Sequence, residues 1–111
     1  MNYTVIVAED EELLLNNLVQ KIQKADPDFQ IVGTAQTGDQ ALALVEKLQP
    51  DLIITDIRMP VMDGIEFLQE LRKRKLHCET VVLSGFNDYD LVRRAMKLGA
   101  IDYLTKPFGK D

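Results

Sequence analysis

The sequence predicts a doubly wound α/β domain, with a five-stranded parallel sheet covered by helices on both faces. Short runs rich in Val, Ile and Leu alternate along the chain with longer segments whose apolar residues recur at helical spacing. The connections between these segments are short, as expected for right-handed crossovers between parallel strands. At 111 residues, without an internal repeat or a linker, the chain is expected to form one domain over residues 1–111.

The first and third expected strands are short apolar runs, of the length typical of strands buried in a parallel sheet. The first run is followed by four acidic residues, and the third is followed closely by a single aspartate. The fourth is followed by a serine and the fifth by a lysine. The five strands are expected at residues 3–8, 31–35, 52–54, 80–83 and 102–105.

The four expected helices have recognisable ends. Thr37 with Gln40, and Asp63 with Glu66, have the spacing of capping boxes, in which two residues bond reciprocally across the first turn of a helix. Asp88 is expected to cap the fourth helix. A proline follows each of the first two helices and a glycine follows the fourth, so these ends are marked as well.

The composition argues against several classes of function. The net charge of −5 disfavours a sequence-independent grip on nucleic acid, because phosphate backbones are bound by clustered Lys and Arg. No apolar run is long enough to span a membrane, and no signal peptide is visible. Cys78 is the one cysteine and cannot form a disulfide within the chain, in agreement with a reducing compartment. We therefore expect a cytoplasmic protein with no direct contact to nucleic acid or membrane.

Polar side chains of different kinds follow four of the five expected strands. Glu9 and Asp10 follow the first strand, Asp56 the third, Ser84 the fourth and Lys106 the fifth. The carboxyl ends of parallel strands meet at one edge of a sheet, where open α/β sheets bind their ligands. We therefore expect these five side chains to converge on one cleft.

The chemistry of this set predicts transfer of a phosphoryl group onto the protein. Three carboxylates brought together repel one another unless a cation neutralises them, and hard oxygen ligands at an open cleft suit Mg²⁺. With Mg²⁺ and Lys106 offsetting the charge of the phosphoryl oxygens, Asp56 is able to attack a phosphoryl group in line and form an acyl phosphate. Ser84 would donate a hydrogen bond to the bound group.

Over essentially its whole length the chain resembles the receiver domain of two-component response regulators. The residues at 84–89 and 99–104 are most similar to receivers attached to helix-turn-helix transcription regulators of the arabinose-regulator type. The motifs that carry the family resemblance are the acidic pair Glu9-Asp10, Asp56 followed by Met-Pro-Val-Met-Asp-Gly at 59–64, Ser84, and Lys106-Pro107.

The resemblance implies a metal site. Asp56 would be the phosphoacceptor, and Asp10 would ligate Mg²⁺ directly together with it. The backbone carbonyl of Arg58 would be a further ligand. Glu9 stands where many family members have Asp, and its longer side chain would act mainly through water.

The resemblance also implies a switch and its partners. Ser84 and Tyr103 would change conformation on phosphorylation, so that the face made by the fourth helix and fifth strand reports the state of Asp56. Lys106 and Pro107 would be joined by a cis peptide. The phosphoryl donor would be a sensor histidine kinase, and a covalently attached output domain that binds DNA would control transcription.

The implied sheet has the flavodoxin-like order 2-1-3-4-5. Right-handed crossovers would then place the first helix on one face and the next three on the other. Family members continue into a fifth helix and commonly an output domain, whereas this sequence ends at Asp111. We therefore expect a receiver truncated before its fifth helix, which leaves an apolar sheet face that lowers stability or is hidden by self-association.

Three other functions fit the pattern less well. A phosphatase of haloacid-dehalogenase type carries a second Asp two residues after its nucleophile, where this chain has Arg58, so the general acid needed for turnover is missing. A flavodoxin-like nucleotide binder needs amides and hydroxyls around a phosphate in its first loop, whereas residues 9–12 are acidic. A receiver fold kept only for protein contacts usually lacks the acceptor or the lysine, and both are present. We expect a phosphoacceptor domain that catalyses its own phosphorylation and dephosphorylation and is not a turnover enzyme.

Overall fold

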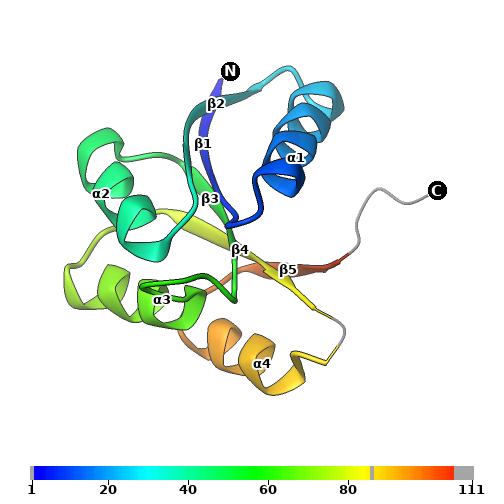
Figure 1. Cartoon of the computed structure of the whole chain (residues 1–111). Helices are drawn as coiled ribbons and strands as arrows, with labels where there is room; N and C mark the ends of the chain where they lie inside the picture. Colours follow the sequence, from blue (N-terminus) through cyan, green and yellow to red (C-terminus); the bar gives the residue numbers. More distant parts are fainter. Residues whose placement is uncertain (1, 86, 107–111) are drawn as a thin grey trace.

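The computed structural model describes residues 2–85 and 87–106, in which helices and strands alternate. The strands form one parallel sheet in the order β2-β1-β3-β4-β5 (Figure 1). The predicted fold class and strand order are therefore confirmed. The elements are β1 (Tyr3–Ala8), α1 (Glu12–Ala25), β2 (Phe29–Ala35), α2 (Gly38–Leu48), β3 (Leu52–Asp56), α3 (Gly64–Lys73), β4 (Glu79–Ser84), α4 (Tyr89–Lys97) and β5 (Asp102–Thr105).

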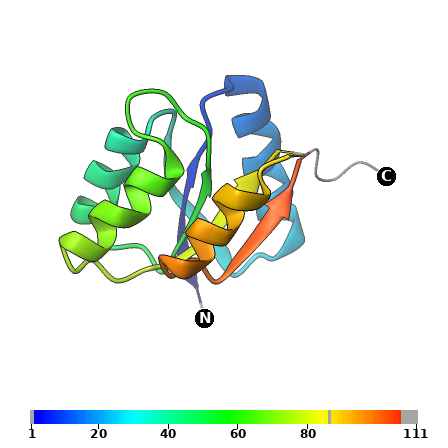
Figure 2. The ribbon, with the colours of Figure 1, turned by 90° about the horizontal axis from the view of Figure 1, so that it is seen from below.

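The described helices cover the two faces of the sheet unequally. α1 lies on one face, and α2, α3 and α4 lie side by side on the other (Figure 1, Figure 2). Strand side chains feed two hydrophobic clusters, because successive residues of a strand point to opposite faces. In β1, Val5 and Val7 pack with Leu15 and Leu18 of α1, whereas Ile6 belongs to the larger cluster beneath the other three helices. The expected distribution of helices is thus confirmed.

The helices are amphipathic and of ordinary length. α1 has 14 residues and buries Leu15 and Leu18, while Leu13 on its other side is 75% exposed. In the part of the chain that the structure describes, no helix combines the length and apolar character needed to cross a membrane.

Several strands are longer than their apolar runs. β2 begins at Phe29 instead of Ile31, and the Phe29 ring meets the edge of the Tyr3 ring with 6.1 Å between centroids. β3 extends to Asp56 and β4 to Ser84. The ladder of backbone hydrogen bonds does not require apolar side chains, so it continues past the residues that mark the core. Asp56 and Ser84 are therefore held by the sheet itself.

The capping boxes are formed to different extents. At α3, Asp63 Oδ1 accepts a hydrogen bond from the Glu66 N–H at 2.8 Å, and Glu66 Oε1 accepts from the Asp63 N–H at 3.1 Å. At α2, Thr37 Oγ1 accepts from the Gln40 N–H at 3.4 Å, but Gln40 Oε1 accepts from the N–H of Gln36. The box predicted for α3 is confirmed, and the one predicted for α2 is only half formed.

Gly64 holds the loop between β3 and α3 close to the end of β3. Its N–H donates to the Ile57 carbonyl at 2.7 Å. A Cβ atom at residue 64 would lie 2.6 Å from the carbonyl oxygen of Asp56, closer than packed atoms approach. A residue without a side chain therefore lets the first turn of α3 pack against the strand end that carries Asp56.

Val61, in the same loop, has a left-handed backbone with φ of 69°, and its side chain is 79% exposed. A β-branched residue is strained at positive φ, and this side chain has little packing to lose. We expect Val61→Asn to raise the free energy of unfolding by about 1 kcal/mol, because asparagine adopts this conformation more readily. Urea unfolding measures the change.

Val61→Thr is the matched control, since threonine is polar but keeps the β-branch. It should leave the free energy of unfolding close to that of the unsubstituted protein. Equal gains for the two variants would show that polarity, and not relief of backbone strain, is the cause.

Candidate functional site

Side chains from three strand ends meet at the carboxyl edge of the sheet. Glu9 and Asp10 directly follow β1, Asp56 is the last residue of β3, and Lys106 directly follows β5. One carboxylate oxygen from each of Glu9, Asp10 and Asp56 lies within 4.8 Å of the other two. The Lys106 Nζ lies 2.5 Å from Asp56 Oδ2 and 2.7 Å from Glu9 Oε1. Since β4 separates β3 from β5, the Lys106 side chain reaches across the end of β4 to make these contacts.

Lys106 links two buried carboxylates. The side chains of Glu9 and Asp56 are 0% and 5% exposed, against 24% for Lys106. Partial burial opposes the charge of the ammonium, but its contacts with Asp56 and then Glu9 outweigh this and raise the pKa of Lys106. Lys106 is therefore a cation at physiological pH. Pro107, where the resemblance implies a cis peptide, lies outside the described residues.

The carboxylates have capacity for a further cation. Glu9 Oε2 accepts a hydrogen bond from the Glu11 N–H at 3.0 Å, whereas the buried Oε1 has no hydrogen-bond partner among the described residues and is balanced only by the charge of Lys106. Asp10 lies at the surface, and partial desolvation together with the adjacent Glu9 carboxylate raises the pKa of Asp10. Three carboxylates against one ammonium favour a divalent ion with oxygen ligands, so the residues present fit Mg²⁺.

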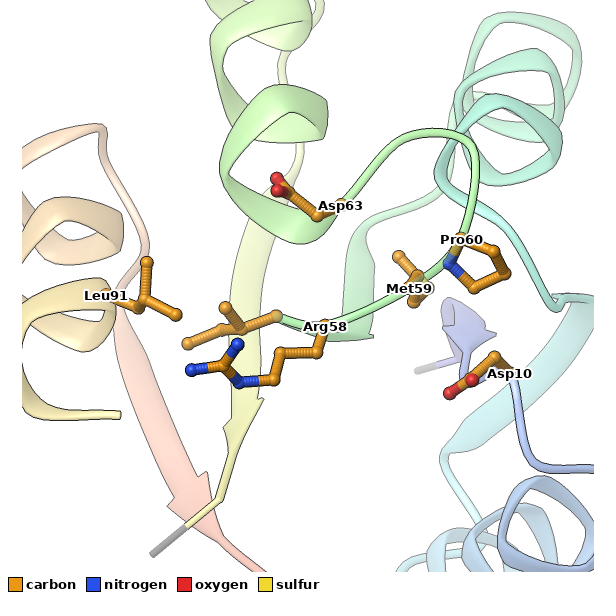
Figure 3. Close-up of a pocket in the computed structure, with 7 residues that line it drawn as sticks. Asp10, Arg58, Met59, Pro60, Asp63 and Leu91 are labelled. Carbon is orange, nitrogen blue, oxygen red and sulfur yellow. The ribbon is translucent and has the colours of Figure 1, made fainter. Parts of the chain in front are cut away.

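A depression of about 540 Å³ lies beside the acidic cluster. Figure 3 shows Asp10 and Leu91 on opposite sides of it, with the Arg58 side chain between them. The Arg58 N–H donates to Asp56 Oδ1 at 3.3 Å, so one residue touches Asp56 with its backbone and lines the depression with its side chain. The complete lining is Asp10, Ile57, Arg58, Met59, Pro60, Asp63 and Leu91.

Ser84 and Tyr103 border a second pocket, on the α4 side of the sheet. Ser84 Oγ donates to the carbonyl of Leu104 on β5 at 3.4 Å, so in this structure the hydroxyl bonds to the sheet and not to Asp56. Tyr103 is 46% exposed and lines the same pocket of about 440 Å³, together with Tyr89 of α4. The two residues expected to act as a switch are therefore neighbours around one pocket.

Asp88 has partners that the sequence pattern does not indicate. It is the N-cap residue of α4, as predicted, and its carbonyl accepts from the Val92 N–H, but its side chain makes no hydrogen bond to the first turn of that helix. Asp88 Oδ1 accepts from the Arg58 Nε at 2.9 Å, and Oδ2 accepts from the Gly85 N–H at 2.6 Å. The hydrogen bond from Arg58 lowers the pKa of the Asp88 carboxyl. Arg58 and Asp88 are 30 residues apart in the chain, so no local pattern could have predicted their pairing.

The arrangement suits nucleophilic chemistry at a carboxylate. Asp56 sits at a strand end, bordered by a protonated lysine and by two carboxylates able to hold a cation. Positive charge placed in this way offsets the negative charge of an electrophile such as a phosphoryl group. An ionised carboxylate is itself a nucleophile, so no neighbouring base has to remove a proton from it first.

Solved structures similar to this chain are receiver domains. The REC domain of AraT, a response regulator from Geobacillus stearothermophilus, matches with a TM-score of 0.86 at 28% identity, covering 96% of this chain and 83% of that chain. A DNA-binding response regulator of the LuxR family from Staphylococcus aureus matches with a TM-score of 0.87 at 32% identity, covering 94% and 86%.

Curated relatives are response regulators as well. The transcriptional regulatory protein HptR of Staphylococcus aureus is 34% identical over 105 residues, and an uncharacterized response regulatory protein of Staphylococcus epidermidis is 35% identical over 105 residues. Each match covers 95% of this chain and 41% of the relative, so the chain spans about two fifths of the length of these relatives. The family model of the response regulator receiver domain matches residues 5–111. The chain therefore belongs to the receiver domains of two-component response regulators.

Proposed function

We propose that this receiver domain takes a phosphoryl group onto Asp56 from a sensor histidine kinase, and that the aspartyl phosphate controls transcription through an attached output domain that binds DNA. The observation that carries the proposal is the position of Asp56, a carboxylate at the end of a buried strand, 2.5 Å from the Lys106 Nζ and beside two further carboxylates. Relatives named as transcriptional and DNA-binding regulators support the output. We expect the protein to act in the cytoplasm.

The transfer is an in-line displacement at phosphorus. A carboxylate oxygen of Asp56 forms the new P–O bond with its own electron pair. The P–N bond of the phosphohistidine breaks. The imidazole leaves with the electron pair of the P–N bond and takes up a proton. Lys106, already in contact with the carboxylate, pairs with the negatively charged oxygens of the phosphoryl group that Asp56 receives.

Four residues would share the task of holding Mg²⁺. Asp10, Asp56 and the backbone carbonyl of Arg58 would be direct ligands, and Glu9 would act mainly through water. The bound ion supplies positive charge beside the phosphoryl oxygens. The exposure of Asp10 and the full burial of Glu9, whose oxygens face Lys106 and the Glu11 N–H, support this division.

The modified protein would be a signal and not an intermediate of turnover. Arg58 stands two residues after Asp56, where a general acid would serve repeated hydrolysis, and its guanidinium cannot donate a proton in this way. Ser84 would turn from the Leu104 carbonyl toward the phosphoryl oxygens, and Tyr103 would follow into the pocket that both residues line. The face formed by α4 and β5 would then differ between the two states.

Asp56→Asn should abolish phosphorylation, because the amide is a far weaker nucleophile than the carboxylate. Incubation with phosphoramidate and Mg²⁺, followed by intact-mass and peptide mass spectrometry, measures the extent and the position of phosphorylation. The unsubstituted protein should gain one acid-labile phosphoryl group at Asp56.

Asp28→Asn is the control, since this exposed aspartate lies before β2 at the opposite edge of the sheet. It should be modified like the unsubstituted protein. Modification of Asp56→Asn at the normal level, or mapping of the group to Ser84, would disprove the assignment.

Asp10→Ala should weaken Mg²⁺ binding roughly tenfold more than Glu9→Ala, because a direct ligand is lost in the first case and an outer one in the second. Isothermal titration calorimetry with MgCl₂ measures both without any phosphoryl donor. Glu12→Ala, which removes an exposed acid in the first turn of α1, controls for general loss of negative charge. A larger loss for Glu9→Ala would mean that Glu9 itself reaches the ion.

A further inference from the structure

The contacts of Asp88 form a chain of hydrogen bonds across the mouth of the site. Arg58 donates to Asp88 Oδ1 through Nε at 2.9 Å, and a second guanidinium nitrogen lies 2.7 Å from the same oxygen. Asp88 Oδ2 accepts from the Gly85 N–H at 2.6 Å. Arg58 lies two residues beyond Asp56, and Gly85 directly follows Ser84. These hydrogen bonds therefore join the end of β3 to the end of β4 beside the phosphoacceptor.

Burial makes this contact more consequential than an ordinary surface ion pair. The Asp88 side chain is only 5% exposed, whereas that of Arg58 is 70% exposed. A buried carboxylate is costly without partners, and both oxygens of Asp88 are occupied, one by Arg58 and one by Gly85. The exposed guanidinium, by contrast, can leave with little loss of packing. The Asp88 side chain is thus held in place, whereas the Arg58 side chain is free to rearrange.

The Arg58 guanidinium and the Gly85 N–H, which bond to Asp88 here, are also the donors that a phosphoryl group on Asp56 would attract. A phosphoryl group brings about two negative charges and three acceptor oxygens, and a guanidinium fork matches phosphate oxygens well. Arg58 already touches Asp56 through its backbone N–H, and the charge of Asp56 acts on its guanidinium. The Gly85 N–H lies beside Ser84, the hydroxyl expected to bond the new group.

We propose that the Arg58–Asp88 pair, with the bond from Gly85 to Asp88, is a latch that stabilises the unphosphorylated arrangement of this site. The inference rests on the proposed phosphorylation of Asp56 and adds a regulation of it. In the phosphorylated protein, Arg58 and the Gly85 N–H turn from Asp88 toward the phosphoryl oxygens. A contact present in one state only shifts the equilibrium by its own free energy, so the latch opposes phosphorylation.

This role predicts unequal effects for the two partners. Asp88 acts only in the unphosphorylated state, so Asp88→Asn should speed phosphorylation by phosphoramidate about threefold, a modest gain because the asparagine oxygen can still accept a hydrogen bond and only the charge is lost. Arg58 acts in both states, so Arg58→Ala should change the rate less. In the Arg58→Ala background, Asp88→Asn should have little further effect. A purely structural role would instead lower the melting temperature of both single variants without raising the rate.

Hydrogen exchange of the Gly85 amide, followed by NMR in the unphosphorylated protein, tests the latch without any phosphoryl donor. The amide should exchange slowly in the unsubstituted protein, faster in Arg58→Ala, and fastest in Asp88→Ala, which removes its acceptor. Arg74→Ala is the matched control, because Arg74 pairs with Glu46 and Glu70 through an exposed guanidinium outside this network. Unchanged exchange in Asp88→Ala would overturn the proposal.

The two measurements separate failure of the latch from failure of the proposed function. If the unsubstituted protein takes no phosphoryl group, the proposed function falls and this inference falls with it. If it is modified at Asp56 but Asp88→Asn is modified no faster, while melting at the same temperature, only the latch is overturned. Faster modification of Asp88→Asn together with faster exchange at Gly85 supports both.

Discussion

The contact of Lys106 with Asp56 and Glu9 is the interaction on which the rest of the site depends. Two carboxylates that are almost completely buried would repel each other, and an unpaired charge in such surroundings costs several kcal/mol. The ammonium removes that cost and stays protonated, because its partners raise the pKa of Lys106. Since its side chain crosses the end of β4, the same contact ties β5 to β1 and β3, two strands that β5 does not pair with. The Lys106 contact therefore both compensates the charge of the two carboxylates and links the end of β5 to the ends of β1 and β3.

The loop after β3 is the second constraint, and it is a backbone constraint. Gly64 lets α3 begin directly against the Asp56 carbonyl, and the Met62 carbonyl accepts from the Gly38 N–H at 3.0 Å, which ties the loop to the start of α2. Val61, directly before Met62, has a positive φ. A loop fixed at both ends gives Arg58 a defined starting point, so its N–H meets Asp56 while its side chain extends toward α4 (Figure 3).

The fold could be predicted closely from the sequence, because its determinants are local. Apolar runs and helical periodicity define the elements, and right-handed crossovers leave few arrangements for them. The meeting of Glu9, Asp56 and Lys106 follows from the same topology, since parallel strands end at one edge. The partners of individual polar side chains could not be predicted. Asp88 binds Arg58 and not its own helix, and Ser84 binds the Leu104 carbonyl, because each contact depends on how distant segments lie and on which rotamer is adopted.

The charges around Asp56 explain why phosphorylation and rearrangement would be coupled here. Among the described residues, Lys106 pairs with Glu9 and Asp56, and Arg58 pairs with Asp88, so both cations already have carboxylate partners while Asp10 has no ion pair. A phosphoryl group adds negative charge, so a cation that moves to it must leave a carboxylate behind. Lys106 can turn to the new oxygens without leaving Asp56, whereas Arg58 must release the buried Asp88. The shortage of positive charge thus favours a divalent ion at Asp10, and under the proposed latch the movement of Arg58 would be one step that carries the effect of phosphorylation from β3 toward α4.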